Sequence, residues 1–223
     1  IRDRDRVEAP PLGLSSEFLD GEIAITGRRM RMELCADRSD LDQGWGGAKA
    51  FTSSVGEGPF PTELRDEIGD ELREVGGGEY GASTGRPRRC GWYDAVALRY
   101  AVRINGLDAL AVTKLDVLDG LDEIPFCVAY RHGDQILREF PSHGATLAEC
   151  EPVYERLPGW STPTAGVRRF EDLPREAKTY LDRLVEVTGV PVALVSTGSD
   201  RDDTIVVDGG LIDEWRSVAT VDG

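Results

Sequence analysis

The spacing of apolar residues along this chain predicts a sheet with helices beside it. Short, nearly continuous apolar runs are typical of buried strands, and they cover residues 48–55, 108–113, 124–130, 190–195 and 204–207. Between these runs, apolar residues at helical spacing predict helices over 62–75, over 93–104 and from Pro174 to just before Gly189. Strands that alternate with helices in this way indicate an α/β fold.

Capping residues, glycine and proline mark where these elements end. Thr62 has the side chain of a helix N-cap, and Gly76-Gly77-Gly78 breaks the helix that it begins. Asn105-Gly106 closes the second helix. Residues 151–164 contain Pro158-Gly159-Trp160, so we expect a loop with local turns there. Residues 1–44 mix charges with short apolar runs, and no fold is predicted for them.

Composition limits the partners that this chain can have. With 223 residues, of which 40% are apolar, the chain can bury a substantial core and forms one large domain or part of one. Its 26 basic and 41 acidic residues give a net charge of −15, and such a surface repels a phosphate backbone. We therefore expect no nucleic acid partner, and we interpret the acidity as an aid to solubility, as in a saline cytoplasm.

The cysteines and the apolar runs favour a cytoplasmic protein without a membrane segment. Cys35, Cys90, Cys127 and Cys150 lack C-x-x-C spacing, which favours reduced thiols over a zinc site or disulfides. No apolar stretch approaches the roughly 20 residues that a membrane helix needs. The chain begins at Ile1 rather than at a methionine, so we expect a fragment of a longer protein.

The stretch Thr113-Lys114-Leu115-Asp116 follows a predicted buried strand. Guanine presents two adjacent donors, the ring N1–H and the exocyclic amino group, and the two carboxylate oxygens of Asp116 can accept both. Adenine has an acceptor at N1, so the same carboxylate would reject it. The stem of Lys114 can lie over the base while its ammonium group stays solvated. Ligands of open α/β sheets bind at such strand ends, although Lys-x-Asp taken alone is more often a solvated turn.

Two further polar loops have the composition of ligand sites. The loop from Gly81 to Arg89 combines small residues with three arginines, whose side chains bind carboxylates or phosphates. Pairing of these arginines with nearby acidic residues is the alternative. Ser196 to Arg201 follows another predicted strand, and its small residues would let the backbone approach a planar ligand. An ordinary turn is the alternative there.

The sequence shows neither a phosphate-binding loop nor a catalytic group. The motif G-x-x-x-x-G-K-[ST] is absent, and Gly44 to Lys49 lacks its spacing. His132 and His143 are expected to be surface or loop residues. We therefore predict no catalytic residue and no metal ligand in this chain.

Four stretches in register closely resemble the adenylosuccinate synthetase family. They are VGEGPFPTEL (55–64), TGRPRRCGWYD (84–94), TKLDVLD (113–119) and STG (196–198), and LPGW (157–160) supports them. Their order and spacing match the carboxyl-terminal half of that family from about Gly47 onward. We therefore predict that residues 45–223 are the carboxyl-terminal part of a single adenylosuccinate synthetase domain and that residues 1–44 are not family-like.

The resemblance implies a fold and an activity. The fold is an α/β domain with a P-loop-NTPase-like central sheet and flanking helices, whose amino-terminal half is missing. The activity is GTP-dependent ligation of L-aspartate to IMP through 6-phosphoryl-IMP in AMP biosynthesis, with Mg²⁺ offsetting charge on the transferred group. The phosphate loop, the catalytic Asp and His and the Mg²⁺ ligands belong to the missing half, so the isolated chain should be inactive. A homodimer is implied at full length.

The resemblance also assigns roles to individual residues. The aspartate loop would consist of Ala82, Ser83, Thr84, Gly85, Arg86, Pro87 and Arg88. Within it, Thr84 and Arg86 would bind the carboxylates, Arg86 would also lie near IMP, and Arg88 would approach the GTP phosphates. Guanine would be held by Lys114, Leu115 and Asp116 and packed against Ser196, Thr197 and Gly198.

Two other interpretations remain open from the sequence. A non-catalytic guanine-nucleotide-binding module would use the same base pocket without chemistry. A truncated product without function would be poorly soluble and would have no affinity for GTP. A phosphate loop encoded in frame upstream would favour the enzyme.

Overall fold

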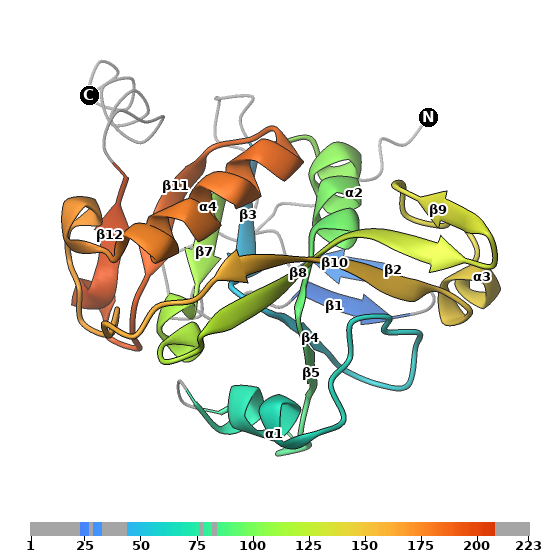
Figure 1. The fold of residues 1–223 in the computed structure, drawn as a ribbon, viewed down its shortest axis with the longest axis horizontal. Helices are drawn as coiled ribbons and strands as arrows, with labels where there is room; N and C mark the ends of the chain where they lie inside the picture. Colours follow the sequence, from blue (N-terminus) through green and yellow to red (C-terminus); the bar gives the residue numbers. More distant parts are fainter. Residues whose placement is uncertain (1–22, 27–28, 33–43, 76–77, 82–83, 208–223) are drawn as a thin grey trace, which may run out of the picture.

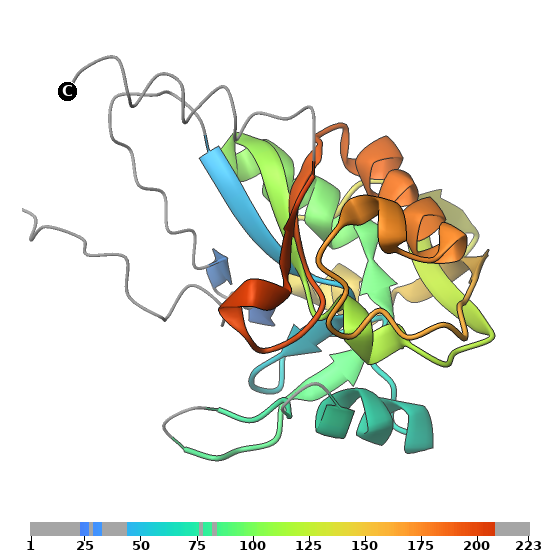
Figure 2. The same cartoon turned by 90° about the vertical axis from the view of Figure 1, so that its left-hand side faces the viewer.

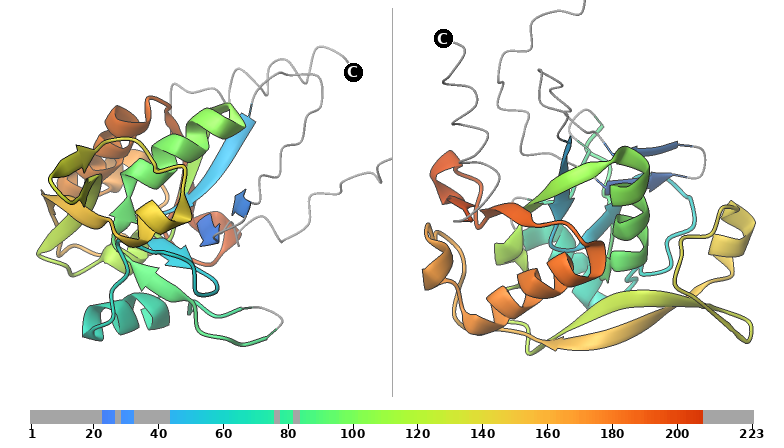
Figure 3. Two further views of the ribbon diagram at one scale, coloured as in Figure 1. Left: turned by 90° about the vertical axis from the view of Figure 1, so that its right-hand side faces the viewer. Right: turned by 90° about the horizontal axis from the view of Figure 1, so that it is seen from above.

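The computed structural model describes residues 23–26, 29–32, 44–75, 78–81 and 84–207 (Figure 1). Two helices lie between two sheets in this region, and a smaller lobe with one helix projects from them (Figures 1 and 3). The α/β fold with flanking helices that the sequence predicted is confirmed.

The first sheet carries the strand ends that form the candidate site. Its strands β12, β11, β7 and β3 lie side by side in that order, with the bounds Thr204–Val206, Val192–Ser196, Leu107–Thr113 and Gly44–Lys49. Both β3 and β11 pair with β7 in parallel, whereas β12 is antiparallel to β11. The carboxyl ends of β3, β7 and β11 therefore meet along one edge of the sheet.

The second sheet contains a strand that sequence reasoning missed. Strands β10, β8 and β6 lie in that order, and β9 pairs with β8; their bounds are Glu151–Pro158, Glu123–His132, Tyr93–Asp94 and Gln135–Leu137. The loop predicted over 151–164 was wrong for the residues of β10. Because β10 is an edge strand with mostly exposed or half-buried side chains, it lacks the apolar run that marks a buried strand.

Helices α2 (Ala95–Asn105) and α4 (Arg175–Thr188) fill the space between the sheets (Figure 3). Both end as predicted, because Gly106 and Gly189 take left-handed backbone conformations, with φ of 59° and 76°. The core around these helices reaches both sheets, and its largest fully buried side chains include Tyr130, Tyr180, Phe51, Phe126, Leu98 and Leu110.

The smaller lobe packs α1 (Glu67–Glu74) beside the antiparallel pair β4 (Thr52–Ser54) and β5 (Arg89–Gly91) (Figure 2). The single strand predicted over 48–55 is thus divided between β3 and β4. The predicted N-cap at Thr62 was wrong, because Asp66 caps α1 by accepting a hydrogen bond from the Gly69 N–H at 3.1 Å. Thr62 is instead fully buried.

The described residues also include a strand pair and a short helix. Strands β1 (Ile23–Thr26) and β2 (Arg29–Met32) form an antiparallel pair within the segment for which no fold was predicted. The short helix α3 (Gly144–Ala148) precedes β10.

Candidate functional site

The carboxyl edge of the first sheet brings two of the predicted loops together. Lys114 follows β7, and Ser196 ends the neighbouring strand β11. In the parallel registers, Val195 pairs with Val112, and Lys49 at the end of β3 pairs with Thr113. The segments 114–116 and 196–198, both predicted to contact one base, therefore lie next to each other, as expected for a ligand site of an open α/β sheet.

Lys114 has an unusual backbone conformation. Its φ of 60° and ψ of 40° are left-handed, and among the described residues it is the one non-glycine residue with a positive φ. That conformation costs a residue with a Cβ about 1–2 kcal/mol, and such strain is concentrated at functional sites. The next side chain, Leu115, is fully buried, so Leu115 can offer a ligand only its backbone.

Asp116 lies half-buried at the start of the 3₁₀ turn Leu115–Leu118. Burial raises the pKa of its carboxyl, and the nearby carboxylates of Asp119 and Asp203 add to the rise, whereas its own backbone N–H and the charge of Lys114 oppose it. The ionised form is therefore under-stabilised. Two ligand donors that reach this carboxylate would stabilise the charge.

The segment 196–198 uses its hydroxyl groups internally. The Ser196 hydroxyl donates to the carbonyl oxygen of Gly198 at 2.9 Å, and the fully buried Thr197 hydroxyl donates to that of Val167 at 2.8 Å. A Cβ added at Gly198 would collide with the carboxylate of Asp203. What this segment can present to a ligand is mainly backbone, in agreement with a role in packing against a planar base.

Asp119, the last residue of the TKLDVLD stretch, fixes the segment behind Asp116. Its carboxylate accepts hydrogen bonds from Trp160 Nε1 at 2.6 Å and from both the N–H and the hydroxyl of Thr164 at 2.7 Å. The backbone N–H of Gly120 donates to the carbonyl oxygen of Trp160 at 2.9 Å. These bonds hold the connection after β10 against the turn that carries Asp116.

The third predicted loop is a narrow excursion between α1 and β5 (Figure 2). We call it the arginine loop (residues 79–88); Ala82 and Ser83 lie outside the described residues. Its two arms are joined where the Arg88 N–H donates to the Glu79 carbonyl oxygen at 2.8 Å and the Gly81 N–H donates to that of Arg86 at 2.9 Å. The side chain of Arg86 is exposed.

The far end of the arginine loop is open to solvent. Thr84, Gly85 and Pro87 are exposed, and Gly85 turns the chain with a φ of 62°. The Thr84 hydroxyl accepts a hydrogen bond from the Arg86 N–H at 3.4 Å. Thr84 and Arg86, the residues predicted to bind carboxylates, are thus both accessible to a ligand.

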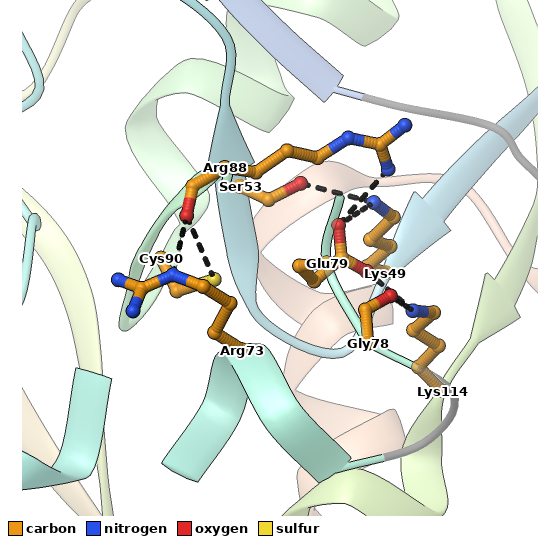
Figure 4. A network of polar contacts seen from close by, with 8 residues as sticks. All are labelled: Lys49, Ser53, Arg73, Gly78, Glu79, Arg88, Cys90 and Lys114. Carbon is orange, nitrogen blue, oxygen red and sulfur yellow. Dashed lines mark hydrogen bonds and ion pairs between the residues drawn. The ribbon is translucent and has the colours of Figure 1, made fainter. Parts of the chain in front are cut away.

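A buried carboxylate connects the arginine loop to the sheet edge (Figure 4). The side chain of Glu79 is fully buried, and its Oε2 accepts from Lys49 Nζ at 2.8 Å and from Arg88 Nη1 at 3.0 Å. Its Oε1 accepts from Lys114 Nζ. Lys49 is only 2% exposed and also donates to the Ser53 hydroxyl at 3.0 Å. We call Lys49, Glu79, Arg88 and Lys114 the Glu79 cluster.

The Glu79 cluster carries more positive than negative charge. Burial alone would raise the pKa of Glu79, but attraction by Lys49 and the hydrogen bonds from Lys114 and Lys49 outweigh burial and lower the pKa to about 2. Burial lowers the pKa of Lys49, and Glu79 opposes that shift. Three cations around one carboxylate favour the approach of an anionic ligand to this edge of the sheet.

The hydrogen bonds of Arg89 hold neighbouring parts of the chain together. It donates from Nε and Nη2, both at 2.7 Å, to the two carboxylate oxygens of Glu63, and from Nη1 to the carbonyl oxygens of Gly56 and Gly58 at 2.9 and 2.7 Å. Pairing with acidic residues, which was the alternative for the three arginines, therefore applies to Arg89. Arg88 also pairs with an acidic residue, but within the Glu79 cluster.

Sequence reasoning did not single out Lys49 and Glu79. Lys49 ends β3 in the structure, but it lies near the start of the strand predicted over 48–55, so its place at the sheet edge was not visible in the sequence. Glu79 directly follows the break Gly76-Gly77-Gly78. Glu79 gave no local signal, because its partners Lys49 and Lys114 lie about thirty residues or more away in the chain.

Within the described ranges the residues do not fit a divalent metal. No three His, Cys, Asp or Glu side chains there come close enough to hold an ion. His132 is half-buried beside Glu149, with Nε2 2.9 Å from a carboxylate oxygen, and His143 is exposed. No helix in this part of the chain is both long and apolar enough to cross a membrane.

The fold places this chain among the α/β proteins with parallel strands, a class in which ligands commonly bind at the carboxyl ends of those strands. A family model described as adenylosuccinate synthetase matches residues 25–205. The chain belongs to the adenylosuccinate synthetase family, as the four motifs indicated. The match begins earlier than Gly47, within the segment that was predicted not to be family-like.

Individual relatives agree with this assignment. Proteins named adenylosuccinate synthetase from Desulforamulus reducens and Pelotomaculum thermopropionicum are 56% and 57% identical over 168 and 161 residues, which are 75% and 72% of this chain. A solved structure of fully ligated adenylosuccinate synthetase from Plasmodium falciparum is 38% identical over 75% of this chain, with a TM-score of 0.72. This chain spans only about two fifths of each relative's length: 39%, 38% and 40%.

Proposed function

We propose that this chain supplies the guanine-binding and aspartate-binding parts of an adenylosuccinate synthetase, a ligase that joins L-aspartate to IMP with GTP through 6-phosphoryl-IMP. The observation that carries the proposal is that segments 114–116 and 196–198 share one sheet edge, to which Glu79 joins the arginine loop. Residues 45–223 would form the carboxyl-terminal part of the enzyme's single domain.

Base recognition would rest on Asp116. Its two oxygens would accept from the ring N1–H and the amino group of guanine, which would stabilise the charge that burial disfavours. Lys114 would lie over the base, and Leu115 would contribute its backbone. Ser196, Thr197 and Gly198 would pack their backbone against the base.

The arginine loop would receive the other anions. Thr84 and Arg86 are exposed and would bind the carboxylates of L-aspartate, with Arg86 also close to IMP. Arg88, held by Glu79, would face the GTP phosphates. Ala82, Ser83, Gly85 and Pro87 would shape the loop around L-aspartate.

The chemistry requires the 6-oxygen of IMP, a poor leaving group, to be phosphorylated before the aspartate amine displaces it as phosphate. This chain would bind and orient the reactants, which lowers the barrier by fixing their approach. Mg²⁺ would offset the charge on the transferred group, but the described residues do not fit it, so we assign them no step through the ion. We expect the chain alone to be inactive, and the full-length enzyme to be a cytoplasmic homodimer.

The base pocket can be tested on this chain directly. Wild type should bind GDP in preference to ADP, and Asp116→Asn should weaken GDP binding roughly 10- to 100-fold, because a hydrogen-bonded charge is lost. The same substitution should admit XDP, since the 2-oxygen of xanthine can accept from an amide. Asp122→Asn, an exposed neighbour, is the matched control. Calorimetry that finds unchanged guanine preference in Asp116→Asn would reject the pocket.

The ligase activity needs a separate experiment. A hybrid that joins residues 25–223 to the amino-terminal part of the Desulforamulus reducens relative should form adenylosuccinate from IMP, L-aspartate and GTP. The 223-residue chain alone should form none. Turnover by the chain alone would contradict our placement of the catalytic groups outside it, and a hybrid that binds GTP without turnover would favour a non-catalytic module.

A further inference from the structure

We propose that Glu79 is a positioning residue that couples the base-binding edge of the first sheet to the arginine loop. Within the described residues, its carboxylate contacts both Lys114, two residues before Asp116, and Arg88 of the arginine loop. The effect of this coupling on nucleotide binding rests on the proposed function. The physical coupling between the two segments does not.

The contacts divide between the two carboxylate oxygens. Oε1 takes the bond from Lys114, while Oε2 takes the bonds from Lys49 and Arg88. Rotation of the carboxylate toward one cation therefore weakens its bonds to the others. Lys49 is buried at the end of β3 and acts as the fixed point of the arrangement.

The backbone of Glu79 joins the same arrangement. Its N–H donates to the carbonyl oxygen of Arg73 in α1 at 2.6 Å, and its own carbonyl oxygen accepts from the Arg88 N–H at 2.8 Å. The Arg73 guanidinium in turn donates from Nε to the Arg88 carbonyl oxygen at 2.9 Å (Figure 4). A shift of Glu79 must therefore move Arg88, through both its backbone and its side chain.

The pair formed by Glu63 and Arg89 shows what a purely structural ion pair looks like in this lobe. That pair joins two carboxylate oxygens to one guanidinium and pins a neighbouring turn. Glu79 instead gathers cations from three separate segments, and one of them, Lys114, has a strained backbone. Buried ion networks add little net stability, so stability alone is a poor reason for this arrangement.

Coupling of this kind acts in both directions. A base that contacts Lys114 changes its bond to Glu79 and so changes the position of Arg88. An anion that binds Arg88 must change the affinity of the base site by the same factor, because linkage is reciprocal.

The coupling can be measured in the ligand-free chain by hydrogen exchange at the Gly81 and Arg88 amides, whose bonds close the arginine loop. Lys114→Met should slow their exchange several-fold, because the Glu79 carboxylate, released from Lys114, can turn toward Arg88. Glu79→Gln should instead speed their exchange, and adding Lys114→Met to Glu79→Gln should have no further effect. If the two effects instead add, or if Lys114→Met leaves both amides unchanged, the proposal is overturned.

Two control variants test whether the response is specific to Glu79 and whether the protein still folds. Glu63→Gln removes a different carboxylate from the same lobe and should leave the response to Lys114→Met intact. Glu79→Gln leaves Lys49 buried without its carboxylate, so the chain carrying it could fail to fold. Glu79→Gln with Lys49→Met restores the original excess of two positive charges. In this background Lys114→Met must again leave the exchange of the Gly81 and Arg88 amides unchanged.

GDP separates this inference from the proposed function. In wild type, GDP should slow exchange at the Gly81 and Arg88 amides; in Glu79→Gln, GDP should bind at Asp116 without slowing it. Equal protection in both proteins would overturn the coupling. If GDP does not bind wild type at all, the proposed function fails, while the ligand-free measurements still decide whether Glu79 couples the two segments.

Discussion

Lys114 places a charged side chain on a backbone conformation that L-residues avoid. The ion pair with Glu79 helps to hold that conformation, and the buried Leu115 fixes the next residue. Residues in strained backbone conformations are concentrated at functional sites, where the surrounding structure holds them in place. At this position we infer that the side chain is needed at the sheet edge.

Two substitutions separate the backbone of Lys114 from its ammonium group. Lys114→Ala and Lys114→Gly both remove the ion pair, but glycine takes a φ of +60° without a Cβ clash. Lys114→Gly should therefore be more stable than Lys114→Ala by about 0.5–1 kcal/mol after the greater freedom of unfolded glycine is included. Urea unfolding measures the difference. Equal stabilities would show that the strain is no larger than the entropic cost of glycine, about 0.4–1 kcal/mol.

Asp94 makes stability depend on pH. Burial raises the pKa of its carboxyl to about 6, against the hydrogen bonds from the Tyr130 hydroxyl, at 2.5 Å, and from the Ala97 and Val96 amides of α2. The folded chain therefore holds this proton more tightly than the unfolded chain, whose value is 3.8. Its contribution to stability is full below about pH 4 and is lost as pH rises through about 6.

Asp94→Asn should remove the loss of stability with rising pH, while the asparagine oxygen still caps the N-terminus of α2. Between pH 4.5 and 7, wild type should lose about 2 kcal/mol relative to Asp94→Asn, at about 1.4 kcal/mol for each unit of pKa. Glu79 stays ionised throughout this window, because its pKa is about 2. Parallel pH profiles of unfolding free energy for the two proteins would disprove the assignment.

At the scale of elements, the connection after β10 is held by a close approach of two backbones. The N–H of Gly159 donates to the Asp122 carbonyl oxygen at 2.9 Å, and a Cβ at Gly159 would overlap the carbonyl oxygen of Leu121. Since Asp119 binds Trp160 in the same place, this approach supports the turn that carries Asp116. Only a residue without a side chain fits there.

Gly159→Ala should therefore destabilise the chain by about 1–3 kcal/mol, the usual cost of forcing extra atoms into a packed site. Gly144→Ala is the matched control, because a Cβ there meets open space. We expect Gly144→Ala to be neutral or slightly stabilising, since alanine favours a helix. Thermal unfolding compares the two variants, and a tolerated Gly159→Ala would mean that the two backbones can separate freely.

Elements were predictable where one local pattern determined them. The apolar runs located β7, β8 and β11, and glycines located the ends of α2 and α4. β10 was missed because its pairing with β8 defines it as a strand, whereas its own sequence contains no run of buried apolar residues. The same distinction holds at the site: the Lys-x-Asp spacing is local and was seen, whereas the contacts of Glu79 join distant segments and were not.

At the scale of the whole molecule, the net charge of −15 opposes folding by self-repulsion. Raising salt from 0.01 to 0.1 M shortens the Debye length from about 30 to about 10 Å. The melting temperature should therefore rise by roughly 2–4 °C, the shift that about 1 kcal/mol produces in a chain of this size. Repeating the melt near the pH of zero net charge should abolish the rise. A fall with salt at neutral pH would contradict self-repulsion.

The pairing order of the first sheet sets the order in which the site can be built as the chain leaves the ribosome. β3 can pair only after β7 has been synthesised, because Lys49 pairs with Thr113. β7 can pair on its other side only after β11 has been synthesised, because Val112 pairs with Val195. Contacts between such distant segments form slowly, and synthesis favours the amino-terminal ones first. The Glu79 cluster can therefore assemble once Lys114 has emerged, while the base pocket is completed only after Gly198.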